Sequence, residues 1–163
     1  MNAITLIKQQ HREVERLFKQ IEQCEDGDGD EIRRLFADLA DDLAAHAEME
    51  EELFYPEVKQ RDQEGMIQIA VQEHFEMKRY IAQLLDMDDP LSSEFVMVLA
   101  QLKDAVLSHV EEEEAQMLPT AQKLFAKGDL DSLGEEMEAR FEQLKSEEPR
   151  FEVRDQLDAP AQV

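Results

Sequence analysis

Hydrophobic residues recur every three or four positions along most of this chain, which is the spacing of an amphipathic helix. The spacing predicts four long helices, over residues 3–24, 32–65, 66–87 and 91–127. A weaker stripe of the same period covers residues 130–144, and no period continues beyond Ser146. We therefore expect four long helices, an additional C-terminal amphipathic helix and a polar tail that is frayed or disordered.

Glycine and proline are sparse, at five residues each, and good helix formers are plentiful, so we predict an all-α fold. Four long helices with short connections favour an up-down-up-down four-helix bundle. We assign residues 1–128 to this bundle and residues 129–163 to the C-terminal helix and tail. The C-terminal helix is expected either to cap the bundle or to pack against another subunit or a partner protein.

The four histidines of the chain indicate an internal duplication. His74 follows His11 by 63 positions, and His109 follows His46 by the same number. Each histidine lies on the apolar stripe of its predicted helix. The chain is therefore expected to contain two helix-pair repeats, offset by 63 residues and related by an approximate twofold axis.

A glutamate follows two of these histidines by four positions, which places both side chains on one face of a helix. A buried carboxylate without a partner is costly, and two that face each other cost more. A lone histidine on an apolar stripe is more often a core residue than a ligand, but here every histidine has that position and basic residues are scarce nearby. We therefore predict that metal ions neutralise the acids. The candidate ligands are His11, His46, Glu50, His74, His109 and Glu113.

Four imidazoles and two carboxylates suit iron, zinc or copper better than calcium or magnesium. The Glu-x-x-His pattern of ferritin-like di-iron bundles is absent. We interpret Glu51, Glu52, Glu111 and Glu112 as parts of solvated acidic faces. Glu114 stays open, because a local helix distortion could turn the fifth residue after His109 inward in place of the fourth.

Charge narrows the classes of partner. Forty acidic and seventeen basic residues give a formal net charge of −23, which disfavours nucleic acid and anionic membranes as partners. The longest apolar run is far too short to span a membrane, and the N-terminus has no signal segment. Cys24 is the single cysteine, so no intrachain disulfide can form. We expect a soluble, cytoplasmic protein.

The motifs resemble those of the hemerythrin-like, or HHE cation-binding, domain family. The resemblance covers roughly residues 3–127 and consists of His11, HAEME with a downstream LFYP, EH at residues 73–74, and HVEEE with a downstream MLP. It implies a non-haem di-iron centre, oxo- or hydroxo-bridged, inside a four-helix bundle. It further implies His11 and His46 on one iron, His74 and His109 on the other, and Glu50 and Glu113 as bridges. Zinc or manganese could substitute for iron.

One position departs from the oxygen-carrying hemerythrins, which have a fifth histidine four residues after the one that matches His74. This chain has Lys78 there. The coordination position that this histidine would fill on the iron could be left open or be filled by Glu73, Glu114, Lys78 or water. We therefore expect a di-iron protein that binds or senses oxygen, nitric oxide or peroxide, or handles iron under oxidative stress. The alternatives are a di-iron enzyme that decomposes peroxide, with catalase-like or peroxidase activity, and a metal-stabilised or zinc-stabilised interaction module.

Overall fold

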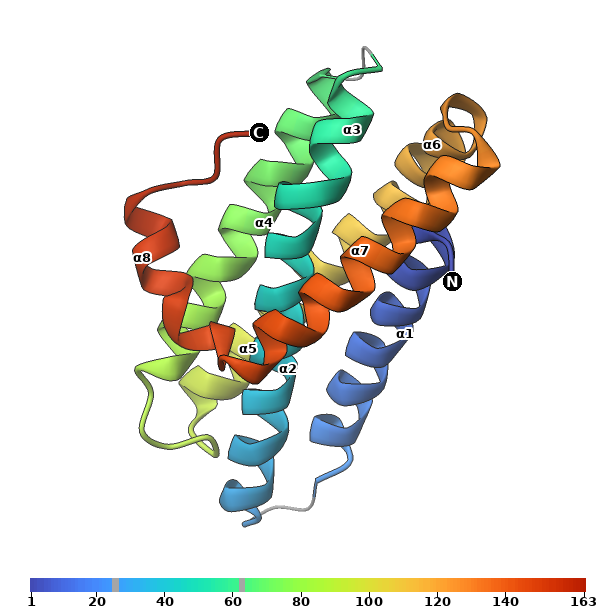
Figure 1. Cartoon of the computed structure of the whole chain (residues 1–163). Coiled ribbons are helices and arrows are strands. Elements are labelled where there is room, and N and C mark those ends of the chain that lie inside the picture. The colour runs from blue at the N-terminus through green and yellow to red at the C-terminus, as the bar shows by residue number, and fades with distance from the viewer. Residues whose placement is uncertain (25–26, 62–63) are drawn as a thin grey trace.

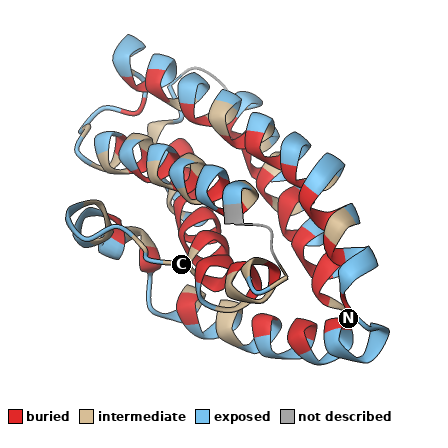
Figure 2. Ribbon diagram, turned by 90° about the horizontal axis from the view of Figure 1, so that it is seen from above, coloured by how far each residue is buried: buried red, intermediate tan, exposed pale blue. Residues whose placement is uncertain are grey.

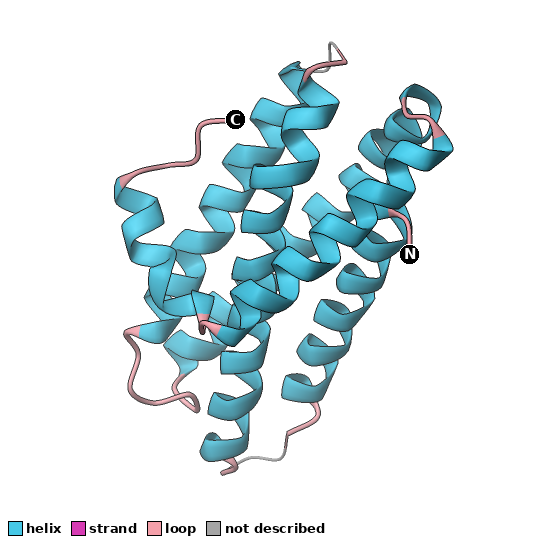
Figure 3. Ribbon diagram, viewed as in Figure 1, coloured by secondary structure: helices cyan, strands magenta, loops and turns pink. Residues whose placement is uncertain are grey.

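The computed structural model describes residues 1–24, 27–61 and 64–163, and every regular element within these ranges is a helix (Figure 3). The elements are α1 (Ala3–Glu22), α2 (Gly29–Met49), η1 (Glu50–Phe54), α3 (Tyr55–Lys59), α4 (Glu64–Leu85), α5 (Ser93–Glu112), η2 (Glu113–Met117), α6 (Leu118–Leu124), α7 (Lys127–Ser146), η3 (Pro149–Glu152) and α8 (Val153–Asp158). The prediction of an all-α chain is confirmed.

The bundle consists of α1, α4 and two composite helices, α2–η1–α3 and α5–η2–α6, which alternate in direction (Figure 1). Polar side chains cap the first turns of three helices. The oxygens of Asn2, Asp28 and Ser92 each accept a hydrogen bond from the backbone N–H three residues later. The four helices of alternating direction confirm the predicted four-helix bundle.

The buried residues of the four bundle helices lie on the sides of the ribbons that face one another (Figure 2). They form two apolar clusters. One includes Phe18, Leu39 and Leu102, and the other includes Ile7 and Phe54. The four histidines fall between these clusters along their helices. A polar layer is therefore enclosed by hydrophobic packing on both sides.

Two π-helical turns interrupt the composite helices at positions related by the repeat, Glu50–Phe54 and Glu113–Met117. In each turn the carbonyl oxygen of the leading glutamate accepts from the backbone N–H five residues later. The residue after each of these N–H donors is a proline, Pro56 in one helix and Pro119 in the other. Neither proline has an N–H with which to continue the α-helical pattern. The distortion of each helix begins at the candidate glutamate itself, Glu50 or Glu113.

The C-terminal helix packs on its own chain. α7 crosses α1 and α2 (Figure 1), and its apolar residues join one of the two core clusters. Two charge pairs support this contact, between Arg140 and Glu52 at 2.6 Å and between Lys145 and Asp42 at 2.6 Å. Of the two positions expected for this segment, the structure shows the one that caps the bundle.

The prediction of a frayed tail after Ser146 is wrong over residues 149–158, which form η3 and α8. Val153 is fully buried, and Arg150 pairs with the buried carboxylate of Asp41 at 2.6 Å. These contacts join residues about 110 positions apart, so no local period could reveal them. The fourth bundle helix also ends earlier than predicted, at Leu124, and the expected division at residue 128 falls inside α7.

Among the described residues, none of the helices is both long and apolar enough to cross a membrane.

Candidate metal centre

The six predicted ligands meet in the polar layer between the two core clusters. Every one of them is buried, and Glu50 and His74 are completely inaccessible. Their candidate ligand atoms form two groups, within each of which all the atoms lie within 4.8 Å of one another. The first group contains His11, His46, Glu50 and Glu113, and the second contains Glu50, His74 and His109. The fold thus brings together all six residues that the sequence pattern singled out.

The outer nitrogen of every imidazole has an oxygen partner. The pairs are His11 Nδ1 with Glu114 at 2.8 Å, His46 Nδ1 with Gln10 Oε1 at 2.7 Å, His74 Nδ1 with Glu51 at 3.0 Å and His109 Nδ1 with Glu73 at 3.1 Å. Carboxylate and amide oxygens only accept hydrogen bonds, so each Nδ1 carries the hydrogen. In the neutral imidazole this leaves Nε2 with a free lone pair that faces the centre, as in metal-ligating histidines.

The inward atoms face acceptors instead of donors. His11 Nε2 lies 3.2 Å from Glu113 Oε1, and His46 Nε2 lies 3.2 Å from Glu50 Oε1. None of these four buried atoms has a hydrogen-bond partner. A shared cation would satisfy all four lone pairs at once, so the donor set fits a bound metal ion.

Without metal, protons on the imidazoles supply the positive charge. Burial lowers the pKa of His74, but Glu50 and Glu51 outweigh it and raise that pKa to about 9. Burial also opposes charging of His11, whose pKa is nevertheless raised by Glu113. Burial likewise disfavours the charged form of Glu50, yet His46 and His74 hold its pKa well below the usual value. Metal binding must therefore displace protons.

Tyr55 belongs to the centre and was missed by the sequence analysis. Its hydroxyl lies 2.9 Å from Glu50 Oε2, 2.9 Å from Glu113 Oε2 and 3.1 Å from His74 Nε2. Complete burial and the two carboxylates raise the pKa of Tyr55 well above its usual value, so the phenol keeps its proton. The residue at the matching position of the second repeat, its repeat mate 63 positions later, is Leu118. This difference between the repeats is the signal that could have pointed to Tyr55.

The charged residues around the centre differ from the prediction at Glu51. The structure also shows where Lys78, Glu73 and Glu114 lie. Glu51 is not part of a solvated face, because it is buried between His74 and Lys78, whose Nζ lies 3.2 Å from its carboxylate. Lys78, at the position of the fifth histidine, therefore pairs with an outer carboxylate. Glu73 and Glu114 contact the Nδ1 atoms of their histidines, on the side away from the centre. The π-helical turns explain why consecutive glutamates both reach imidazoles.

Comparison with known proteins agrees with this geometry. The family model described as the hemerythrin HHE cation binding domain matches residues 2–121. The chain belongs to this family. It is also similar to a protein named DNA nickase from Nostoc sp. (strain PCC 7120 / SAG 25.82 / UTEX 2576), with 37% identity over 117 residues. That match covers 72% of this chain but 32% of the relative, so the chain spans about a third of that protein's length.

A solved structure shares the whole fold. The crystal structure of a hemerythrin HHE cation binding domain-containing protein from Mycobacterium kansasii superposes with a TM-score of 0.80, at 24% identity, over 99% of this chain and 95% of the other. The shared region therefore includes the C-terminal helices as well as the bundle. Family membership and the two buried His/Glu groups together indicate a metal-binding helical bundle.

Proposed function

We propose that this hemerythrin-family protein holds two iron ions, oxo- or hydroxo-bridged, and binds or senses oxygen, nitric oxide or peroxide, or handles iron under oxidative stress. One observation carries the proposal: buried imidazole nitrogens and carboxylate oxygens face one another without hydrogen-bond partners. A mixed nitrogen and oxygen donor set suits iron, and zinc or manganese are the expected substitutes. His11 and His46 would hold one ion, His74 and His109 the other, and Glu50 and Glu113 both.

Bound iron would supply a redox-active Lewis acid for a small ligand. The chain's own contribution is orientation and exclusion of water. The outer acceptors fix each imidazole with its Nε2 inward, and the two apolar clusters shield the centre from water above and below. Tyr55 adds a protonated hydroxyl that can donate to one of the two carboxylates at a time, or to a small ligand held beside them.

Decomposition of peroxide is the second candidate function, and Tyr55 favours it. Such a reaction needs a proton donor close to the reacting oxygen. Tyr55 is a fully buried donor within hydrogen-bond distance of three candidate ligands. Lys78 and Glu51 extend from His74 as a chain of charged groups that could exchange protons with it.

Two other functions receive less support. A zinc-stabilised interaction module would use the same ligands, but it would give no role to the buried hydroxyl of Tyr55. The activity in the name of the Nostoc relative is not carried over, because the chain spans about a third of that protein and a net charge of −23 repels DNA. We therefore propose small molecules, not nucleic acid, as the ligands.

Anaerobic iron loading followed by exposure to oxygen, nitric oxide or peroxide tests the proposal. We expect two irons per chain, a near-ultraviolet band from a bridged diferric centre, and a spectral change with at least one of the three ligands. A colourless protein that prefers zinc would contradict the proposal and favour the interaction module. Peroxide consumption above that of free iron would favour the enzyme.

Tyr55→Phe separates ligand binding from proton donation. The variant keeps all six predicted ligands, so it should load the same amount of iron. If Tyr55 donates protons, peroxide consumption should fall by about 100-fold, within the usual range for loss of a general acid. Leu118→Phe at the repeat mate controls for altered packing. Unchanged turnover in Tyr55→Phe would remove the hydroxyl from the reaction.

A further inference from the structure

A cavity of about 230 Å³ leads from the surface to one side of the centre. It lies between α4, α5 and η2 in the second repeat, and His109 and Glu113 form part of its lining. Ile69, which is 50% exposed, stands in its wall, and Glu73 and Glu112 supply further carboxylates. The cavity thus joins solvent to two of the six predicted metal ligands.

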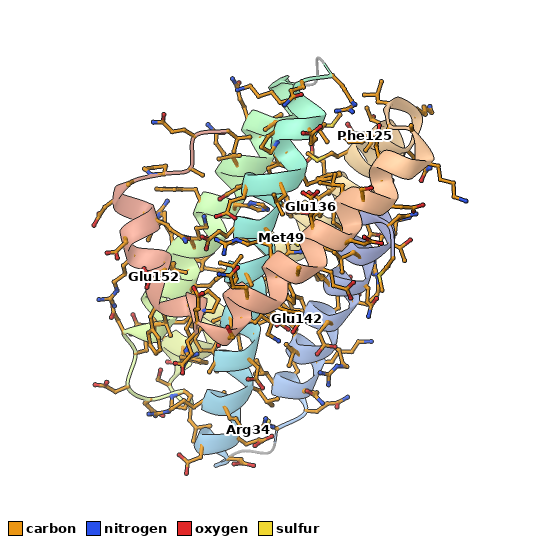
Figure 4. All side chains as sticks on the ribbon, in the orientation of Figure 1. Arg34, Met49, Phe125, Glu136, Glu142 and Glu152 are labelled. Carbon is orange, nitrogen blue, oxygen red and sulfur yellow. The ribbon has the colours of Figure 1, made fainter. Side chains whose placement is uncertain are left out.

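The equivalent place in the first repeat does not reach the centre. A cavity of about 280 Å³ lies there between α1, α2 and α7, lined by Leu6 and Gln10 but by none of the six predicted ligands. The repeat mates of Ile69, Glu73 and Glu112 are Leu6, Gln10 and Met49, and all three mates are buried. Met49 shares an apolar cluster with Leu133 and Met137 of α7, and Figure 4 labels it where α7 crosses the middle of the bundle. α7 therefore covers Met49 in the first repeat, whereas Glu112, at the matching position of the second repeat, is exposed.

Two pairs of matching positions also differ in charge. The second repeat has Glu73 and Glu112 where the first repeat has the uncharged Gln10 and Met49. Among the described residues that line the cavity, every ionisable side chain other than His109 is a carboxylate. A cleft lined by one sign of charge raises the local concentration of the opposite ion.

Glu113 connects the cavity to the metal centre. Glu113 lines the cavity, its side chain is 1% exposed, and its Oε1 has no hydrogen-bond partner. The exposed Glu112, the partly buried Glu73 and the buried Glu113 therefore form a series of carboxylates of increasing burial. Such a series suits a positive ion that loses its water in stages on the way to the centre.

We propose that this cavity is the port through which a divalent metal ion enters the centre, with Glu112 guiding it at the mouth. This inference rests on the proposed metal centre. It adds a direction of entry and assigns a role to Glu112, which is not itself one of the predicted ligands.

Stopped-flow uptake of Co²⁺ by the metal-free protein tests the port without any redox chemistry. Glu112→Gln should slow uptake by about threefold to fivefold at low ionic strength, since one carboxylate near the path is lost. The difference should shrink at high salt because the charge is screened. Glu111→Gln is the matched control, because Glu111 is also exposed but does not line the cavity. The final amount of bound Co²⁺ should stay unchanged in both variants.

A steric variant tests the path itself. Ile69→Trp should obstruct the cavity and slow uptake, whereas Val96→Trp, at an exposed position 58% accessible and outside the lining, should not. Equal rates in Glu112→Gln and Glu111→Gln, or normal uptake by Ile69→Trp, would overturn the port while leaving the metal centre intact. Failure of the wild-type protein to bind Co²⁺ would refute the centre and the port together.

Discussion

The two repeats present the same ligands in different surroundings. His11 and His74 match in position, as do His46 and His109, and even the outer contacts match, since Glu114 serves His11 as Glu51 serves His74. The repeats differ in the residues next to these ligands. Tyr55 stands opposite Leu118, Gln10 opposite Glu73, and Met49 opposite Glu112, as the sequence alignment of the repeats shows.

The two repeats therefore hold their donor atoms alike but surround them with different residues. The first repeat provides the buried phenol and lies beneath α7, and its cavity reaches none of the predicted ligands. The second repeat provides the cavity and the acidic groups beside it. Three experiments break or sharpen the contrast.

Loss of one histidine from each half should have the largest effect. The second ligand group has three members, so His109→Ala leaves it with Glu50 and His74, whereas His46→Ala leaves three members in the first group. We expect His109→Ala to lose one ion per chain, with affinity reduced by more than the roughly 100-fold upper limit for outer-shell partners. His46→Ala should bind both ions more weakly. Elemental analysis after gel filtration measures the number of metal ions per chain. Equal losses in the two variants would contradict the predicted difference between the two ligand groups.

The pH dependence of the metal-free protein should also separate the halves. The pKa of His74 rises from 6.5 to about 9 on folding, so protonated His74 stabilises the fold fully below pH 6.5 and this contribution disappears as pH passes 9. The contribution is up to about 3 kcal/mol. Denaturant unfolding between pH 6 and 10 should therefore show falling stability. His74→Gln should flatten this slope more than His11→Gln, and identical slopes would contradict the asymmetry.

Pushing α7 away from the first repeat should have the smallest effect. A side chain at Gly134 would meet the backbone of the N-terminal segment, with the nitrogen of Ala3 only 2.6 Å from the added Cβ. Gly134→Ala should cost about 1–3 kcal/mol, typical of overpacking. Gly128→Ala, with open space around it, should be neutral or slightly stabilising. Calorimetry compares the two variants, and a neutral Gly134→Ala would mean that α7 packs loosely.

Much of the centre could be predicted because its pattern is local. A histidine and a glutamate four positions apart share a helix face whatever the rest of the chain does, and the 63-residue offset predicted that two such pairs would face each other. The outer groups were less accessible to this reasoning. The inward turn of Glu51 depends on a π-helical turn, and the partner of His46 comes from another helix, at Gln10.

The amino-acid sequence by itself determined the helical fold, the duplication and the six candidate ligands, since each follows from helical periodicity and from the cost of burying unpaired charge. Only the tertiary structure decided that Tyr55 reaches the carboxylates, that a cavity reaches His109 and Glu113, and that residues 149–158 pack as helix. The physical reason is that these features depend on contacts between distant segments, which short-range periodicity does not encode.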